Sequence, residues 1–149
     1  CLIFMDRIIT HILWDNYFMK IYLDIDDTLI NTDIYNIRPA NHLKEFLEFM
    51  LKNHDVYWLT THCSGDATEA VLWMSKYVSP DIVDLIMRIK PTKWKVSKTE
   101  AINMNDDFLW FDDAPTAEDI DVLEKHNKLN SLVKVNLDEN PDILKEFLD

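Results

Sequence analysis

Three short runs of apolar residues are each followed directly by polar or acidic residues. The runs occupy positions 20–23, 56–59 and 108–111, and branched and aromatic side chains dominate them. Such runs are typical of strands that are buried on both faces of a parallel sheet. In an open α/β sheet the carboxyl ends of the strands meet at one crevice, where ligands bind. The pattern therefore predicts that the residues following the three runs lie close together.

Between these runs, apolar residues recur at helical spacing, which predicts helices that cover the sheet. The predicted helices lie at 41–52, 66–77, after Pro80, after Ser97, at 116–127 and at 141–148. A fourth strand is predicted at 132–135, and the segment 31–38 is predicted to be a loop. Strands that alternate with helices indicate an α/β fold with a mostly parallel central sheet, covered on both faces.

The first eighteen residues stand apart from this pattern. They are largely apolar, but polar and charged residues interrupt them: Asp6, Arg7, His11 and Asp15. The segment is therefore neither a clean membrane span nor a good signal peptide. Because Met19 begins a natural first strand, we predict an N-terminal extension at 1–18 and a single folded domain at 19–149. The extension is either a non-native appended segment or an extra amphipathic helix over the sheet.

Composition narrows the classes of function. The chain has 149 residues, enough for one domain with a real core. Its 27 acidic and 15 basic residues give a formal charge of −12, which argues against non-specific binding to nucleic acid. The two cysteines, Cys1 and Cys63, form no metal-binding pair, so a reduced, cytoplasmic setting is expected. A single glycine excludes glycine-rich phosphate loops.

The acidic residues that end the first run suit phosphoryl transfer. Asp24 and Asp26 are two positions apart, so in an extended chain both side chains can point the same way. A carboxylate nucleophile at Asp24 can form an aspartyl-phosphate. Asp26 can then protonate the leaving group and later deprotonate a water molecule. The sequence therefore predicts a nucleophile and an acid/base at one strand end.

A cation is expected at the same place, because the nucleophile and the phosphate are both anionic. Mg²⁺ prefers carboxylate, water and phosphate oxygens in an octahedral array. The predicted ligands are Asp24, Asp26, Asp112 and Asp113. Thr60 can donate a hydrogen bond to a phosphate oxygen, and a lysine can offset the negative charge of the transition state.

These motifs closely resemble those of the haloacid dehalogenase (HAD) phosphohydrolase superfamily. The first motif, an apolar strand followed by D-x-D-x-T-L, corresponds to Asp24–Leu29, and the second corresponds to the run that ends at Thr60. The fourth, an apolar strand that ends in paired acids, corresponds to Phe108–Asp113. The third is only a lysine, assigned to Lys98, fourteen residues before Asp112. Its rivals are Lys90, Lys93 and Lys95.

The resemblance implies a Rossmann-like three-layer sandwich, bound Mg²⁺, metal ligation by the Asp26 backbone carbonyl, and a HAD-like catalytic domain at 19–149. The intervals 30–55 and 62–97 are too short for a sizeable cap domain. Capless members of the family act on accessible or macromolecular phosphates, so phosphoproteins and nucleic acid ends are the expected substrates. Shorter runs around Trp58 and Trp110 also look like small bacterial and phage HAD proteins, some of them related to RNA-repair phosphatase modules.

Residues close to these motifs receive weaker assignments. Thr61 is the alternative to Thr60 as a phosphate ligand, and His62 is a candidate for substrate binding. We expect Trp58, Trp73 and Trp110 to be core residues, whereas Trp94, in a basic connector, is the tryptophan that could contact substrate.

Two other functional classes stay open. A phosphoacceptor signalling domain also ends its first strand in paired acids and uses a late lysine, but it needs an aspartate where this chain has Thr60. A catalytically silent HAD fold that serves as a binding module is the other alternative.

Overall fold

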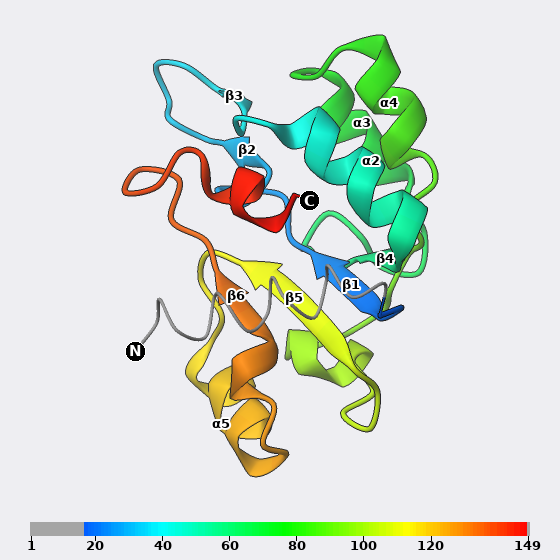
Figure 1. The fold of residues 1–149 in the computed structure, drawn as a ribbon, viewed down its shortest axis with the longest axis vertical. Coiled ribbons are helices and arrows are strands. Elements are labelled where there is room, and N and C mark those ends of the chain that lie inside the picture. The colour runs from blue at the N-terminus through cyan, green and yellow to red at the C-terminus, as the bar shows by residue number, and fades with distance from the viewer. Residues whose placement is uncertain (1–16, 149) are drawn as a thin grey trace.

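A computed structural model of the chain describes residues 17–148 (Figure 1). Its centre is a four-stranded sheet in the order β4-β1-β5-β6, in which every neighbouring pair is parallel. The strands are β1 (Lys20–Leu23), β4 (Asp55–Trp58), β5 (Phe108–Asp112) and β6 (Leu132–Lys134). All four predicted strands are therefore confirmed. The predicted extension at 1–18 lies outside the described residues, except for Tyr17 and Phe18.

Side chains that alternate along the strands divide the core into two clusters, one on each face of the sheet. Ile21 and Leu23 of β1 belong to the larger cluster, whereas Tyr22 between them belongs to the smaller one. In β5, Leu109 and Phe111 join the larger cluster, and Trp110 joins the smaller one. The strand runs are continuously apolar because both faces are covered, as expected of a parallel sheet.

Helices cover both faces of the sheet. On the larger cluster lie α2 (Leu43–Asn53), α3 (Thr68–Ser75), α4 (Pro80–Ile86) and the 3₁₀ helix η3 (Ile143–Phe147). On the smaller cluster lie α5 (Ala117–Lys125) and the 3₁₀ helix η1 (Lys98–Ala101), and a short 3₁₀ turn, η2 (Leu129–Ser131), leads into β6. The predicted helical segments are thus confirmed, although the segment after Ser97 and the last segment are 3₁₀ helices. The chain is an α/β protein.

The segment predicted as a loop at 31–38 contains a small hairpin instead. Strands β2 (Ile30–Asn31) and β3 (Arg38–Pro39) pair antiparallel, with 32–37 as the connection. The turn between β1 and the hairpin is tight, because the backbone amides of Leu29 and Ile30 both donate to the carbonyl of Ile25. The hairpin therefore rises directly from the carboxyl end of β1 (Figure 1).

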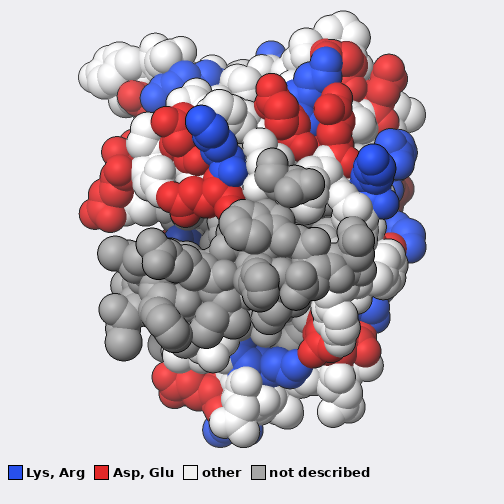
Figure 2. All heavy atoms as spheres, viewed as in Figure 1, with Lys and Arg blue, Asp and Glu red and all other residues white. Residues whose placement is uncertain are grey.

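Charged side chains of both signs are interspersed on the face of the molecule shown in Figure 2, including the region over α2 and α4 at the upper right. Lys44 of α2 forms a 2.7 Å ion pair with Asp81 of α4 in this region. Among the described residues, this face shows no continuous basic area. Separately, none of the described helices has the length and apolar character needed to cross a membrane.

Candidate active site

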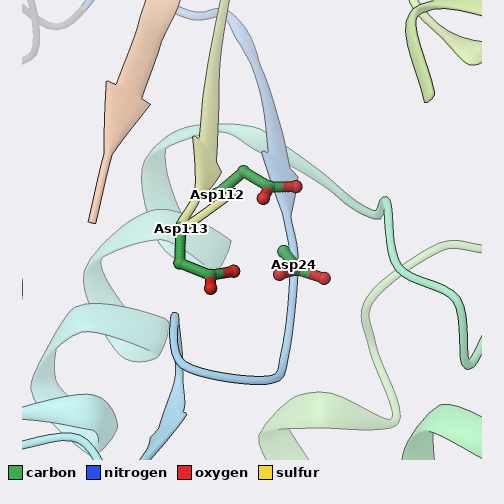
Figure 3. A group of neighbouring side chains, drawn as sticks. All are labelled: Asp24, Asp112 and Asp113. Carbon is green, nitrogen blue, oxygen red and sulfur yellow. The ribbon is translucent and has the colours of Figure 1, made fainter. Parts of the chain in front are cut away.

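Three carboxylates meet where β1 and β5 end. Asp112 is the last residue of β5, Asp113 follows it, and Asp24 directly follows β1. The two strands are aligned so that Leu23 pairs with Phe111, and the Asp24 amide donates to the Phe111 carbonyl at 3.0 Å. One ligand oxygen from each of the three carboxylates lies within 4.8 Å of the others. Figure 3 shows the three groups turned toward a common space.

Lys98 lies among these carboxylates. Its Nζ donates to Asp112 Oδ2 at 2.6 Å and to Asp24 Oδ1 at 3.1 Å, and the side chain is only 14% exposed. Of the rival lysines, Lys90 pairs with Asp55 at the opposite end of the sheet, while Lys93 and Lys95 are exposed to solvent. Lys98 is therefore the sequence candidate that the structure brings to Asp24.

A buried aspartate, which sequence reasoning missed, fixes the position of η1 and hence of Lys98. Asp119 of α5 is almost fully buried, and its Oδ1 accepts from the Thr99 amide at 3.0 Å and from the Ser97 hydroxyl. Its Oδ2 accepts from the Thr116 hydroxyl at 2.9 Å. Burial opposes the charge of Asp119, but these hydrogen bonds hold its pKa below the ordinary value. The T-x-x-D spacing of the α5 capping box is the signal that could have identified it.

The charges of the site are unbalanced. Burial, together with the neighbouring charge of Asp112, raises the pKa of Asp24 to about 7, although Lys98 opposes this shift. Burial also raises the pKa of Asp113, with a further contribution from Asp112. Burial alone would lower the pKa of Lys98, but Asp24 and Asp112 raise it. In the described part of the chain, one ammonium group thus pairs with two of the three neighbouring carboxylates, so the site has room for further positive charge.

Asp26 does not join this group, since its carboxylate is turned toward other partners. Its Oδ2 lies 2.8 Å from His62 Nε2, and its Oδ1 accepts from the indole N–H of Trp73 at 3.0 Å. The Asp26 side chain is 41% exposed. Strand β1 ends at Leu23, and a turn closes on the Ile25 carbonyl, so the alternation expected of an extended chain does not continue to Asp26. The predicted set of four carboxylates is therefore three in the structure.

Hydroxyl groups surround the end of β1. Thr60 is fully buried just beyond β4, and the Leu59 amide donates to the Leu23 carbonyl at 2.8 Å, which places this loop beside Asp24. The Thr60 hydroxyl accepts from the His62 amide at 3.3 Å, whereas Thr61 is exposed. Sequence reasoning gave no role in the site to Thr28, whose hydroxyl is buried and donates to Asp24 Oδ2 at 3.3 Å.

The tryptophans follow the prediction only in part. Trp58 and Trp110 are fully buried in the core, as predicted. Trp73 is half-buried and packs against the larger core cluster, as predicted, and in addition its indole N–H donates to Asp26. Trp94 packs against the smaller core cluster.

Comparisons with protein-family models, with curated proteins and with solved structures gave no significant match.

Proposed function

We propose that this chain is a Mg²⁺-dependent phosphomonoester hydrolase of the HAD type, which works through an aspartyl-phosphate on Asp24. The observation that carries the proposal is the pairing of the buried Asp24 carboxylate with Lys98, beside Asp112 and Asp113 at the end of the adjacent parallel strand. A structural ion pair would need one carboxylate for one lysine. An excess of buried carboxylates is a costly arrangement that is typical of functional sites.

The proposed chemistry has two steps. In the first, an Asp24 oxygen attacks phosphorus, the bond from phosphorus to the leaving oxygen breaks, and the Asp26 carboxyl group gives its proton to that oxygen. In the second, Asp26 takes a proton from water, the water oxygen attacks phosphorus, and the bond to Asp24 breaks. Lys98 would offset the negative charge on the phosphoryl oxygens, and the Thr60 hydroxyl would donate to one of them.

The residues present fit a magnesium ion. Asp24, Asp112 and Asp113 offer only oxygen ligands, and burial together with the neighbouring charge of Asp112 raises the pKa values of Asp24 and Asp113, which a bound cation would oppose. When bound, Mg²⁺ would neutralise the repulsion between nucleophile and phosphate. These three side chains would hold it, and Asp26 would contribute through its backbone carbonyl, as the family resemblance implies, rather than through its carboxylate.

We further propose a Rossmann-like three-layer architecture without a cap domain and an accessible or macromolecular phosphate as substrate. Helices on both faces of the parallel sheet support a Rossmann-like three-layer sandwich. Among the described residues, the insertion that follows β1 is only the β2–β3 hairpin, which supports a capless site. An uncapped site would admit an accessible or macromolecular phosphate, on a phosphoprotein or a nucleic acid end. A cytoplasmic location belongs to the same proposal.

Activity is tested with a panel of phosphomonoesters. We expect the purified protein with Mg²⁺ to hydrolyse an aryl phosphate and at least one macromolecular substrate among phosphopeptides and oligonucleotides with 5′ or 3′ phosphates. EDTA should abolish turnover, and excess Mg²⁺ should restore it. No hydrolysis across the panel would contradict the proposal and favour a silent binding module. Stable phosphorylation of Asp24 without turnover would favour a phosphoacceptor domain.

Binding of Mg²⁺ should also stabilise the fold. A ligand at a hundred times its Kd adds about 2.7 kcal/mol to the free energy of unfolding, so the Tm should rise by roughly 5–10 °C. Without Mg²⁺, the raised pKa of Asp24 makes its contribution to stability fall as the pH rises from 3.8 towards about 7. Below about pH 7 a proton on Asp24 competes with the metal ion for the carboxylate. The Mg²⁺-induced rise in Tm should therefore be larger at pH 8 than at pH 5.5.

The control for this titration is Asp112→Asn, which keeps an oxygen acceptor for the Ala114 amide at 2.9 Å but removes the charge. The variant should lose most of the Mg²⁺-induced rise in Tm, and Asp113→Asn should lose less. A wild-type Tm that does not respond to Mg²⁺ at pH 8 would rule out the metal site.

A further inference from the structure

Asp26, the proposed acid/base, is held by two aromatic side chains from different parts of the chain. Trp73 comes from α3 and His62 from the loop after β4, and together they contact both oxygens of the carboxylate. Without partners, a carboxylate that is 41% exposed would rotate freely about its side-chain bonds. The two contacts therefore select one orientation of a group that otherwise lies at the surface.

The two rings support each other. The imidazole of His62 stacks on the indole of Trp73, with 5.2 Å between centroids and 13° between planes. Tyr77 packs edge-on against the same indole at 5.3 Å, and the ammonium group of Lys76 lies 5.2 Å from its centroid. The buried residues Ala70 and Met74 fix α3 in the core. These packing contacts hold the indole ring in place, so its N–H points at the Asp26 carboxylate.

The chemistry of the two partners makes the carboxylate oxygens unequal. An indole N–H can only donate, so Asp26 Oδ1, at 3.0 Å from Trp73, is committed as an acceptor. The imidazole nitrogen at 2.8 Å from Oδ2 can donate or accept. Oδ2 is thus the oxygen that can carry a proton without losing its partner. In addition, the His62 amide donates to the Thr60 hydroxyl at 3.3 Å, which links the imidazole to the end of β4.

We propose that Trp73 and His62 are positioning residues for Asp26: the indole holds Oδ1, so that Oδ2 is the oxygen presented to the leaving group. This inference rests on the proposed function. It assigns to His62 a role in orienting Asp26 rather than the substrate contact predicted from the sequence, and it gives a functional role to Trp73.

The test uses substrates that differ in the acidity of their leaving groups. Trp73→Phe keeps an aromatic ring for stacking but removes the N–H. We expect kcat for alkyl phosphates to fall roughly ten- to a hundredfold, with KM unchanged. Activated aryl phosphates need little protonation of the leaving group, so their kcat should hardly change. His62→Phe should act in the same direction, and His62→Gln, which restores a polar partner, should recover part of the loss.

Two controls separate positioning from a general structural effect. Tyr77→Phe alters a ring packed on Trp73 without touching Asp26, and it should leave kcat and its dependence on the leaving group unchanged. In an Asp26→Asn background, Trp73→Phe should cause no further loss, because a residue that acts through Asp26 has nothing left to position. The indole N–H resonance of Trp73 should also shift in Asp26→Asn, which reports the contact without any turnover.

Two results would overturn the inference alone: an equal loss for all leaving groups, or an undiminished effect of Trp73→Phe in the Asp26→Asn background. A wild-type protein without any phosphatase activity would instead overturn the proposed function, and the inference with it.

Discussion

Asp24→Asn should reduce phosphatase turnover by roughly 10⁴- to 10⁶-fold, because the variant lacks the nucleophile on which the two-step reaction depends. The amide has almost the same shape as the carboxylate but cannot form the aspartyl-phosphate. The loss should appear in kcat for every substrate, whatever its leaving group. Single-turnover kinetics with an aryl phosphate, with acid quenching to trap phosphorylated protein, measure both the rate and the intermediate.

The variant should fold, and this separates a chemical effect from a structural one. Asp24 is buried beside Asp112, and burial together with that neighbour raises its pKa, so its charge contributes little to stability without a metal ion. The amide oxygen can still accept from Lys98, and the amide NH2 group at the other position can donate to the Thr28 hydroxyl. We therefore expect a Tm close to that of the wild type in EDTA, but a weaker response to Mg²⁺.

A matched control for Asp24→Asn is Asp84→Asn, the same chemical change at an exposed position of α4. It should alter neither turnover nor the response to Mg²⁺. Wild-type turnover in Asp24→Asn would show that another residue, or a contaminating phosphatase, performs the reaction.

The architecture could be predicted because it follows from continuous apolar runs. The central strands β1 and β5 are buried on both faces, so each forms a run that no amphipathic helix would produce. The hairpin of β2 and β3 was missed because strands of two residues show no periodicity. The final helix was predicted at 141–148, but only 143–147 are helical, in a 3₁₀ conformation.

The site could be predicted as far as strand ends determine it. Asp24 and Asp112 follow neighbouring parallel strands, so the topology alone brings them together. The orientation of Asp26 depends instead on Trp73, which in sequence is one more apolar residue at helical spacing. Which residue of an amphipathic helix reaches past the core to a carboxylate depends on the packing of α3, and no local pattern records it.

Lys98→Met should both slow the reaction and destabilise the fold. The methionine fills a similar volume but leaves Asp24 and Asp112 without the ammonium group that lies 3.1 Å and 2.6 Å from them. Removing one partner from a buried ion pair costs about 3–5 kcal/mol, so thermal and urea unfolding without Mg²⁺ should show a loss near the lower value, because Asp24 can take up a proton. Loss of the positive charge near the phosphoryl group should lower kcat by roughly 10²- to 10³-fold.

The response of this variant to Mg²⁺ distinguishes a charge deficit from a packing defect. If the three carboxylates form the metal site, a divalent cation can replace part of the missing positive charge, so Mg²⁺ should raise the Tm of Lys98→Met by more than that of the wild type. Lys93→Met is the matched control, since it makes the same change at a rival lysine that is exposed to solvent. It should retain wild-type stability and turnover. Equal behaviour of Lys93→Met and Lys98→Met would mean that Lys98 is an ordinary surface lysine. If Mg²⁺ raised the Tm of Lys98→Met by no more than that of the wild type, the destabilisation would be due to packing rather than to the unpaired carboxylates.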